Sequence, residues 1–145
     1  MLQWGWSMGE PAAKAILLVE DNPADVSLIQ RAVAECGHNI RLSVVSNGRD
    51  ALAFLRKDPP FMHAPALALI LLDLNLPILD GYTVLAELRR LPPPQALPVV
   101  IFSSADKDTA EPLCLHLGAS EYVQKPSTLD AFFAAIKAIV GHWLP

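Results

Sequence analysis

Five short runs of apolar and β-branched residues recur along the chain and predict five strands. They cover residues 15–19, 40–45, 67–72, 99–102 and 121–124. The first and third runs are apolar throughout, which is typical of strands buried on both faces of a sheet. The second run alternates between apolar and polar residues and is rich in β-branched residues, which also favours a strand.

Segments with apolar residues at helical spacing follow these runs and predict five helices. We place the helices at residues 24–36, 49–57, 82–90, 109–117 and 128–142. Gly37 and Gly118 are suitable stops for the first and fourth helices. Prolines 92–94 break the third, and Thr128 is expected to cap the last. Strands that alternate with helices predict an α/β fold, a five-stranded parallel sheet doubly wound as (βα)5 with helices on both faces.

Composition and charge narrow the class of protein. The 145 residues are 52% hydrophobic and 18% charged, which suits a globular domain with a sizeable core. The formal net charge is −4, so the chain offers no basic surface for DNA. The longest apolar stretch, residues 64–72, is too short to cross a membrane, and the N-terminus lacks a signal-peptide pattern. We therefore expect a cytoplasmic protein with Cys36 and Cys114 as reduced thiols.

A single domain is expected to occupy residues 14–145. Residues 1–13 precede the first regular element and are expected to form a flexible tail, so Met8 is an alternative to Met1 as the true start. No second domain is expected after Pro145.

Polar residues end four of the five predicted strands. Glu20 and Asp21 follow the first strand, Asp73 the third, Ser103 the fourth and Lys125 the fifth. Ligands of parallel α/β sheets bind outside the carboxyl ends of the strands. We therefore expect three acids, a hydroxyl and a lysine to meet at one edge of the sheet.

Three carboxylates in one cleft oppose each other's ionisation unless a cation compensates their charge. Mg²⁺ suits the site, because it binds carboxylates and phosphate oxygens together. A carboxylate can also act as a nucleophile and form an aspartyl-phosphate. Lys125 and the Ser103 hydroxyl would then stabilise the charge on the transferred phosphoryl group.

Each of these residues also has a simpler interpretation. An acid after a strand can be a turn former or a helix cap, Ser103 can be an N-cap, and Lys125 can be a solvated charge. These interpretations are favoured for single residues. They lose weight because all four strand ends carry compatible chemistry.

Three blocks of the sequence resemble the signature motifs of bacterial response-regulator receiver domains. The blocks are LLVEDN at residues 17–22, LLDLNLP at 71–77 followed by Asp80 and Gly81, and YVQKP at 122–126. The resemblance covers residues 14–142 and implies the flavodoxin-like receiver fold with strand order 2-1-3-4-5. It also implies a stand-alone regulator of a two-component phosphorelay, which catalyses only its own phosphorylation and dephosphorylation. No output domain is expected, so output would depend on protein–protein contacts or on phosphate relay.

The resemblance implies a role for each acidic residue. Asp73 would accept a phosphoryl group from the phosphohistidine of a histidine kinase in a Mg²⁺-dependent reaction. Asp21 would bind Mg²⁺ directly, and Glu20 would act mainly through water. The backbone carbonyl of Asn75 would be the third protein ligand.

The same resemblance implies a switch. Ser103, rather than Ser104, matches the switch hydroxyl, because it lies 30 positions after Asp73 and 22 before Lys125. Lys125 would bind the phosphate and Tyr122 would be the switch aromatic. Phosphate on Asp73 would draw in Ser103, and Tyr122 would move into the vacated space. Alternatively, Tyr122 is a half-buried strand aromatic without a switch role.

A narrower resemblance is to the single-domain regulators that accompany bacterial and cyanobacterial phytochromes. It is carried by EDNPAD at residues 20–25, ALAFL at 51–55, DLNLP at 73–77 and GHWL at 141–144. The resemblance implies a phytochrome-type histidine kinase as the partner.

The last predicted helix has a broad apolar stripe. Its members are Leu129, Phe132, Phe133, Ile136, Ile139, Val140 and Trp143. The stripe is wider than contact with one sheet requires, so we expect a homodimer through this helix region. The alternative is an apolar helix with Trp143 folded back on its own domain.

Three classes of function remain open at the level of sequence. The first is a phosphorylatable receiver, and the second is a pseudo-receiver that binds partners without phosphorylation. The third is a flavodoxin-like enzyme or cofactor binder. The complete polar set disfavours the second class, and Glu20 with Asp21 disfavours the third because they would repel a cofactor phosphate.

Overall fold

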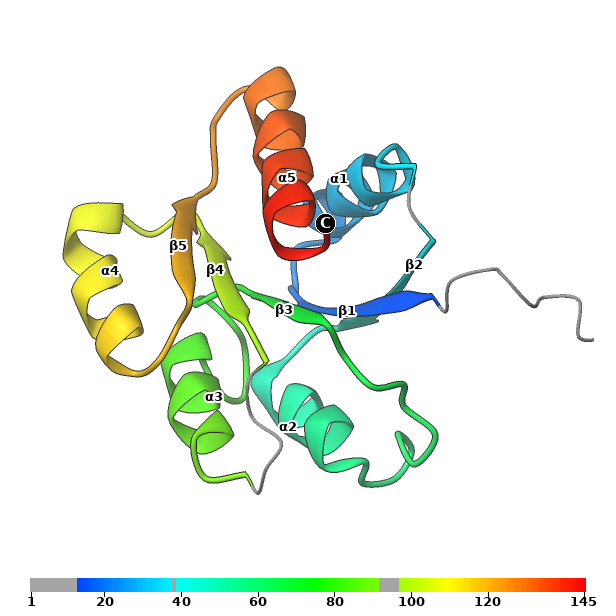
Figure 1. The fold of residues 1–145 in the computed structure, drawn as a ribbon. Coiled ribbons are helices and arrows are strands. Elements are labelled where there is room, and N and C mark those ends of the chain that lie inside the picture. Colours follow the sequence, from blue (N-terminus) through cyan, green and yellow to red (C-terminus); the bar gives the residue numbers. More distant parts are fainter. Residues whose placement is uncertain (1–12, 38, 92–96) are drawn as a thin grey trace, which may run out of the picture.

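The structure is a computed structural model that describes residues 13–37, 39–91 and 97–145. Almost all of the predicted tail (residues 1–13), as well as prolines 92–94, therefore lies outside the described residues. Within them, five strands alternate with five helices, as predicted (Figure 1). The strands are β1 (Lys14–Val19), β2 (Ile40–Val45), β3 (Leu69–Leu72), β4 (Val99–Ser103) and β5 (Glu121–Gln124). The helices are α1 (Pro23–Ala34), α2 (Gly48–Arg56), α3 (Gly81–Leu88), α4 (Lys107–His116) and α5 (Leu129–Trp143).

All neighbouring strands run parallel, and their order is β2-β1-β3-β4-β5. This confirms the predicted receiver-type topology. Val19 at the end of β1 is paired with Val45 and with Leu72, and Leu72 is paired with Ile101. The register therefore brings the carboxyl ends of the strands to one edge of the sheet, where the polar residues follow them.

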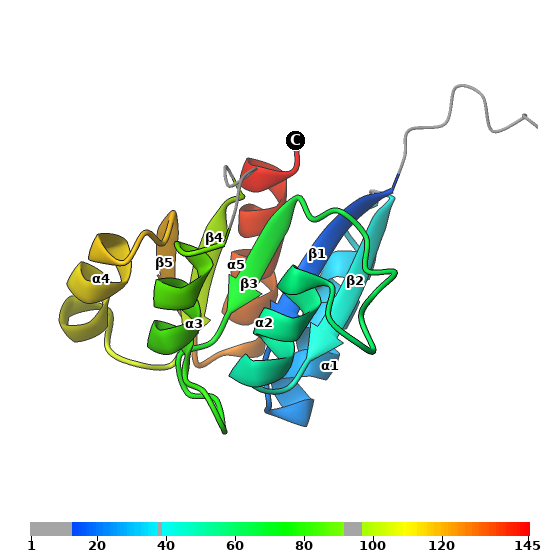
Figure 2. The ribbon, with the colours of Figure 1, turned by 90° about the horizontal axis from the view of Figure 1, so that it is seen from below.

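Helices cover both faces of the sheet. Figures 1 and 2 show α1 and α5 together on one face and α2 and α3 on the other. Alternate residues of the buried strands point to opposite faces. Leu17 and Ile70 accordingly belong to the core shared with α2, α3 and α4, whereas Leu18 and Leu71 belong to the core shared with α1 and α5. Burial on both faces explains why β3 is apolar throughout and why β1 is apolar from Ala15 onward.

Each described helix begins after a residue whose side chain accepts a hydrogen bond from a backbone N–H of the first turn. These N-caps are Asn22, Asn47, Asp80, Asp106 and Thr128, the last as predicted. Gly37 and Gly118, the predicted stops, lie just beyond the ends of α1 and α4, each with a positive φ that favours glycine. Helix ends are thus fixed by local chemistry that the sequence displays.

Several predicted boundaries were wrong by one or two residues. The third strand begins at Leu69 rather than at residue 67, and the first helix ends at Ala34 rather than at residue 36. The fourth helix begins at Lys107 rather than at residue 109, because Asp106 caps it. Ser103 is the last residue of β4, where the prediction had placed it directly after the strand.

No helix among the described residues combines the length and the apolarity that a membrane crossing requires.

Candidate functional site

A cleft of about 470 Å³ opens at the carboxyl ends of β1, β3 and β5. Its lining is mostly polar: Glu20, Asp21, Asn22, Pro23, Asp25, Asp73, Asn75, Ser104 and Lys125. The structure therefore brings together the acids and the lysine that the sequence places after separate strands. Ser104, not Ser103, is the serine that lines this cleft.

Three carboxylates form the acidic part of the cleft. Glu20, Asp21 and Asp73 each place one carboxylate oxygen so that the three atoms lie within 4.8 Å of one another. Glu20 and Asp73 are buried, whereas Asp21 is exposed. Hard oxygen donors with one side open to solvent suit Mg²⁺, which binds a few carboxylates and retains waters or phosphate oxygens. The residues present therefore fit a magnesium ion.

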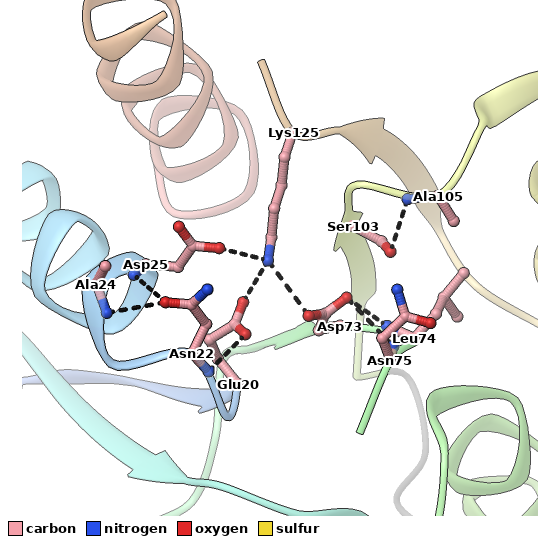
Figure 3. A network of polar contacts seen from close by, with 10 residues as sticks. All are labelled: Glu20, Asn22, Ala24, Asp25, Asp73, Leu74, Asn75, Ser103, Ala105 and Lys125. Carbon is pink, nitrogen blue, oxygen red and sulfur yellow. Dashed lines mark hydrogen bonds and ion pairs between the residues drawn. The ribbon is translucent and has the colours of Figure 1, made fainter. Parts of the chain in front are cut away.

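Asp73 is held by donors on both of its carboxylate oxygens. The backbone N–H groups of Leu74 and Asn75 donate to Oδ1 at 2.7 and 3.4 Å, and the Lys125 ammonium lies 3.2 Å from Oδ2 (Figure 3). The backbone N–H of Asp73 donates to the carbonyl of Val19 at 3.1 Å, which ties it to the end of β1. These contacts fix the orientation of a carboxylate that is 6% exposed.

Lys125 reaches across the cleft from the end of β5. Its Nζ lies 2.6 Å from Glu20 Oε1, 2.8 Å from Asp25 Oδ2 and 3.2 Å from Asp73 Oδ2 (Figure 3). Burial acts to lower the pKa of Lys125, but the hydrogen bonds to Asp25 and Glu20 and the charge of Asp73 outweigh burial and raise it. The lysine is therefore a permanent positive charge at neutral pH.

Glu20 is 2% exposed and lies beside the Asp73 carboxylate. Burial raises the pKa of Glu20 to about 7; the hydrogen bond from Lys125 opposes this rise, and the charge of Asp73 adds to it. A second cation next to Glu20 and Asp73 would offset the cost of keeping both ionised. The electrostatics of the site thus agree with its oxygen donors in favouring a divalent ion.

The two predicted switch residues lie beneath the cleft. Ser103 is fully buried, and its hydroxyl oxygen accepts a hydrogen bond from the Ala105 backbone N–H at 3.2 Å. Tyr122 is 2% exposed, and its hydroxyl donates to the carbonyl of Ala105 at 2.8 Å. Burial raises the pKa of Tyr122 to about 12. Tyr122 is therefore not half-buried, and its ring already lies inside the domain in this structure.

Asp25 is the site residue to which the sequence reasoning gave no role. It lies in the first turn of α1. Its Oδ2 is 2.8 Å from Lys125 Nζ, only 0.2 Å farther than Glu20 Oε1 is. The available signal was its position four residues after Asp21 at the start of a helix that follows β1. That position brings an acid back toward the strand end, but only the fold shows that Lys125 meets it there.

Comparisons with known proteins point to one family. Residues 16–137 match the family model of the response regulator receiver domain. The chain is 34% identical over 131 residues to response regulator Rcp1 of Synechocystis sp., a match that covers 90% of this chain and 89% of Rcp1.

Solved structures agree with this match. The phosphorylated cyanobacterial phytochrome response regulator RcpA superposes with a TM-score of 0.87 at 38% identity, over 92% of this chain and 95% of RcpA. The Mn²⁺-bound form of Rcp1 gives a TM-score of 0.83 at 35% identity, over 90% of this chain and 94% of Rcp1. A receiver domain from Pseudomonas aeruginosa with a magnesium ion in its active-site cleft gives 0.73 at 27% identity, over 91% of this chain and 98% of that one.

Proposed function

The chain belongs to the response regulator receiver family, and on this premise we propose that it is a phospho-accepting signalling protein. Asp73 accepts the phosphoryl group from the phosphohistidine of a histidine kinase. The observation that carries the proposal is the setting of Asp73, with two backbone N–H groups on Oδ1, a lysine on Oδ2 and two further carboxylates beside it. An aspartate that only caps or stabilises the fold would not require a lysine and two further carboxylates around it in addition to the two N–H donors.

In the transfer step, an Asp73 carboxylate oxygen attacks the phosphorus of the phosphohistidine. A P–O bond forms as the P–N bond breaks, and the imidazole keeps the electron pair and takes up a proton. Lys125 and the N–H groups of Leu74 and Asn75 supply charge and hydrogen bonds to the oxygens of the group. Asp21, Asp73 and the backbone carbonyl of Asn75 would hold Mg²⁺ directly, and Glu20 would hold it mainly through water; the ion would supply further charge neutralisation.

Ser103 and Tyr122 are proposed to report the phosphoryl group to the rest of the domain. Both contact Ala105, one through its N–H and the other through its carbonyl. A shift of Ser103 toward Asp73 would therefore move the peptide groups that Tyr122 binds. The Tyr122 ring is already buried in this structure. The expected response is therefore a change in the population of two conformations, or in the hydrogen bonds of the hydroxyl, and not a movement of the ring from solvent into the domain.

The kinase is proposed to be of the phytochrome type, and the location cytoplasmic. Support for the kinase comes from the similarity to RcpA, described as a cyanobacterial phytochrome response regulator, and to Rcp1. These relatives match over nearly the whole of both chains, so the similarity is not confined to the motifs of the acidic cleft.

A homodimer through the α5 region is proposed as well. Most of the predicted stripe packs within the domain, because Phe132, Ile136, Ile139 and Val140 are buried in the core. Leu129, however, is 53% exposed at the start of α5. Light scattering tests this proposal: a dimer mass for the wild type and a monomer mass for Leu129→Lys support it. A monomer mass for both contradicts it. The alternative is then that Trp143 folds back on its own domain, where its indole N–H donates to Glu121 at 2.8 Å.

Phosphorylation is tested by incubating the protein with Mg²⁺ and a small acyl-phosphate donor, followed by intact-mass measurement. We expect one added phosphoryl group on the wild type and none on Asp73→Asn. An unmodified wild type, or equal modification of the two proteins, would refute the proposed function. Transfer from a phytochrome kinase tests the partner separately.

A further inference from the structure

The three contacts of Lys125 are unequal. Its Nζ is closest to Glu20 Oε1, at 2.6 Å, then to Asp25 Oδ2, at 2.8 Å, and farthest from Asp73 Oδ2, at 3.2 Å. An ammonium group has three N–H donors, so three carboxylates occupy all of them. Figure 3 shows Asp25 and Asp73 on opposite sides of the ammonium group. The lysine is thus shared between the acceptor and an acid on α1.

Asp25 is well placed to hold the lysine. Its backbone N–H donates to Asn22 Oδ1 at 3.2 Å, so the helix start fixes its position without using its carboxylate. The side chain is 21% exposed and that of Lys125 is 9% exposed, so the pair is partly withdrawn from water. Charge-assisted hydrogen bonds of this kind are stronger than neutral ones.

Asp25 also differs from the other two acids on Lys125. Glu20 and Asp73 belong to the group whose oxygens suit a metal ion, whereas Asp25 does not. A bound cation would engage Glu20 and Asp73, and it would leave the contact between Asp25 and Lys125 in place. Asp25 therefore remains a competitor for the lysine even when the cleft is loaded.

We propose that Asp25 is a positioning residue that holds Lys125 toward α1 and thereby competes with a phosphoryl group on Asp73 for the lysine. The proposal rests on the proposed function, because it concerns the phosphoryl group at Asp73. Phosphorylation places additional negative charge and acceptor oxygens beside Lys125. To bind them, Lys125 lengthens or gives up its contact with Asp25. The carboxylate of Asp25 thus weakens the binding of a phosphoryl group and sets how long Lys125 stays on it.

The test is the affinity of the full chain for beryllium trifluoride, a phosphoryl mimic on carboxylates, at saturating Mg²⁺ and followed by ¹⁹F NMR. Asp25→Asn keeps the shape of the side chain and removes its charge. We expect the affinity to rise about three- to tenfold, the range for a partly buried, charge-assisted pair. The matched control is Asp130→Asn, since Asp130 is a first-turn acid of α5 with an exposed side chain. The control should keep the wild-type affinity.

A second measurement addresses the lysine directly and needs neither metal nor phosphoryl mimic. The ¹⁵N-coupled protons of the Lys125 ammonium should exchange faster with water in Asp25→Asn than in the wild type, because a neutral amide oxygen holds the ammonium more weakly than a carboxylate does. Unchanged exchange and unchanged affinity in Asp25→Asn would overturn the inference. Equal affinity gains in Asp25→Asn and Asp130→Asn would also overturn it, because they would indicate a general charge effect.

The two proposals fail in distinguishable ways. If the wild type neither takes up phosphate nor binds beryllium trifluoride, the proposed function fails, and the exchange measurement still reports on the pair of Asp25 and Lys125. If the wild type binds and Asp25→Asn behaves like it, only the role of Asp25 fails. Asp25→Ala serves as a second variant in case Asp25→Asn folds poorly.

Discussion

Glu20 makes the metal site sensitive to pH, because a proton and Mg²⁺ compete for the same carboxylate. Its pKa, raised by burial to about 7 from an ordinary 4.5, lies close to neutrality. We expect Mg²⁺ affinity to fall by up to about tenfold per pH unit below pH 7, since each bound ion must release a proton. Calorimetric titration with Mg²⁺ between pH 6 and 8, a range of roughly one unit on either side of the pKa, measures this dependence.

The ionisation of Glu20 should also make the free energy of unfolding depend on pH, in the direction opposite to that of the Mg²⁺ affinity. A carboxyl pKa that is higher in the folded than in the unfolded state means that the folded protein binds the proton more tightly between pH 4.5 and 7. The ionised side chain therefore costs stability above pH 7, and this cost is relieved as the pH falls through that value. Glu20→Gln should remove this pH dependence of the free energy of unfolding. If the variant keeps the wild-type dependence, another titrating group causes it.

The Tyr122 hydroxyl donates a hydrogen bond to the Ala105 carbonyl and also interacts with the Ser103 side chain. Tyr122→Phe removes the donor and leaves a part-buried carbonyl without it. We expect the free energy of unfolding to fall by about 1 kcal/mol, the usual net contribution of such a bond. Urea denaturation measures the difference, and a Phe variant as stable as the wild type would mean that water replaces the hydroxyl.

Sequence reasoning identified the charged residues of the cleft except Asp25, and the reason is physical. Glu20, Asp21, Asp73 and Lys125 directly follow strands, so the rule about the carboxyl ends of parallel strands locates them. Asp25 lies on a helix, and its role depends on how far Lys125 extends across the cleft. Such a contact between residues 100 positions apart has no local signature.

Among the elements, α3 begins in close contact with the backbone that follows β3. A Cβ on Gly81, its first residue, would overlap the Asp73 carbonyl oxygen and lie 2.7 Å from the Leu74 Cα. We expect Gly81→Ala to cost about 2 kcal/mol of stability, because backbone rather than a flexible side chain must move. Chemical denaturation measures the cost, and phosphate uptake should fall as Asp73 is displaced.

Gly141 provides the matched control on another helix. It lies within α5, and a Cβ there would have no neighbour within 4 Å. Gly141→Ala should therefore stabilise the protein by about 0.5–1 kcal/mol, through the better helix propensity of alanine. If both alanine variants shift stability in the same direction, helix propensity and not packing controls the two positions.

The order and type of the elements were predictable from sequence, whereas their exact ends were less so. Apolar runs and glycine stops are strong local signals, and the structure confirms the elements that they predict. The start of α4 was missed because Asp106 caps a helix whose first turn is polar. The start of β3 was placed too early because Leu67 and Ala68 are apolar; Ala68 does donate to the Ala15 carbonyl, but the strand begins one residue later.

For the whole molecule, binding of Mg²⁺ at the edge of the sheet should stabilise the fold. An ion that binds only the folded chain adds about 2.7 kcal/mol at a concentration one hundred times its Kd. Thermal denaturation with Mg²⁺ and with a chelator measures this difference. Asp21→Ala should lose most of the stabilisation at little intrinsic cost, because Asp21 is exposed. If Mg²⁺ stabilises that variant as much as it stabilises the wild type, the ion binds at a different site.

The reach of Lys125 also bears on how the protein is made. A ribosome completes Glu20 and Asp73 well before it adds Lys125, which follows them by 105 and 52 positions. Until β5 emerges from the exit tunnel and joins the edge of the sheet, the acids of the nascent chain lack their ammonium partner. If Asp73 accepts phosphate as proposed, a nascent chain would hold the phosphoryl group weakly until β5 and the Lys125 that follows it are in place.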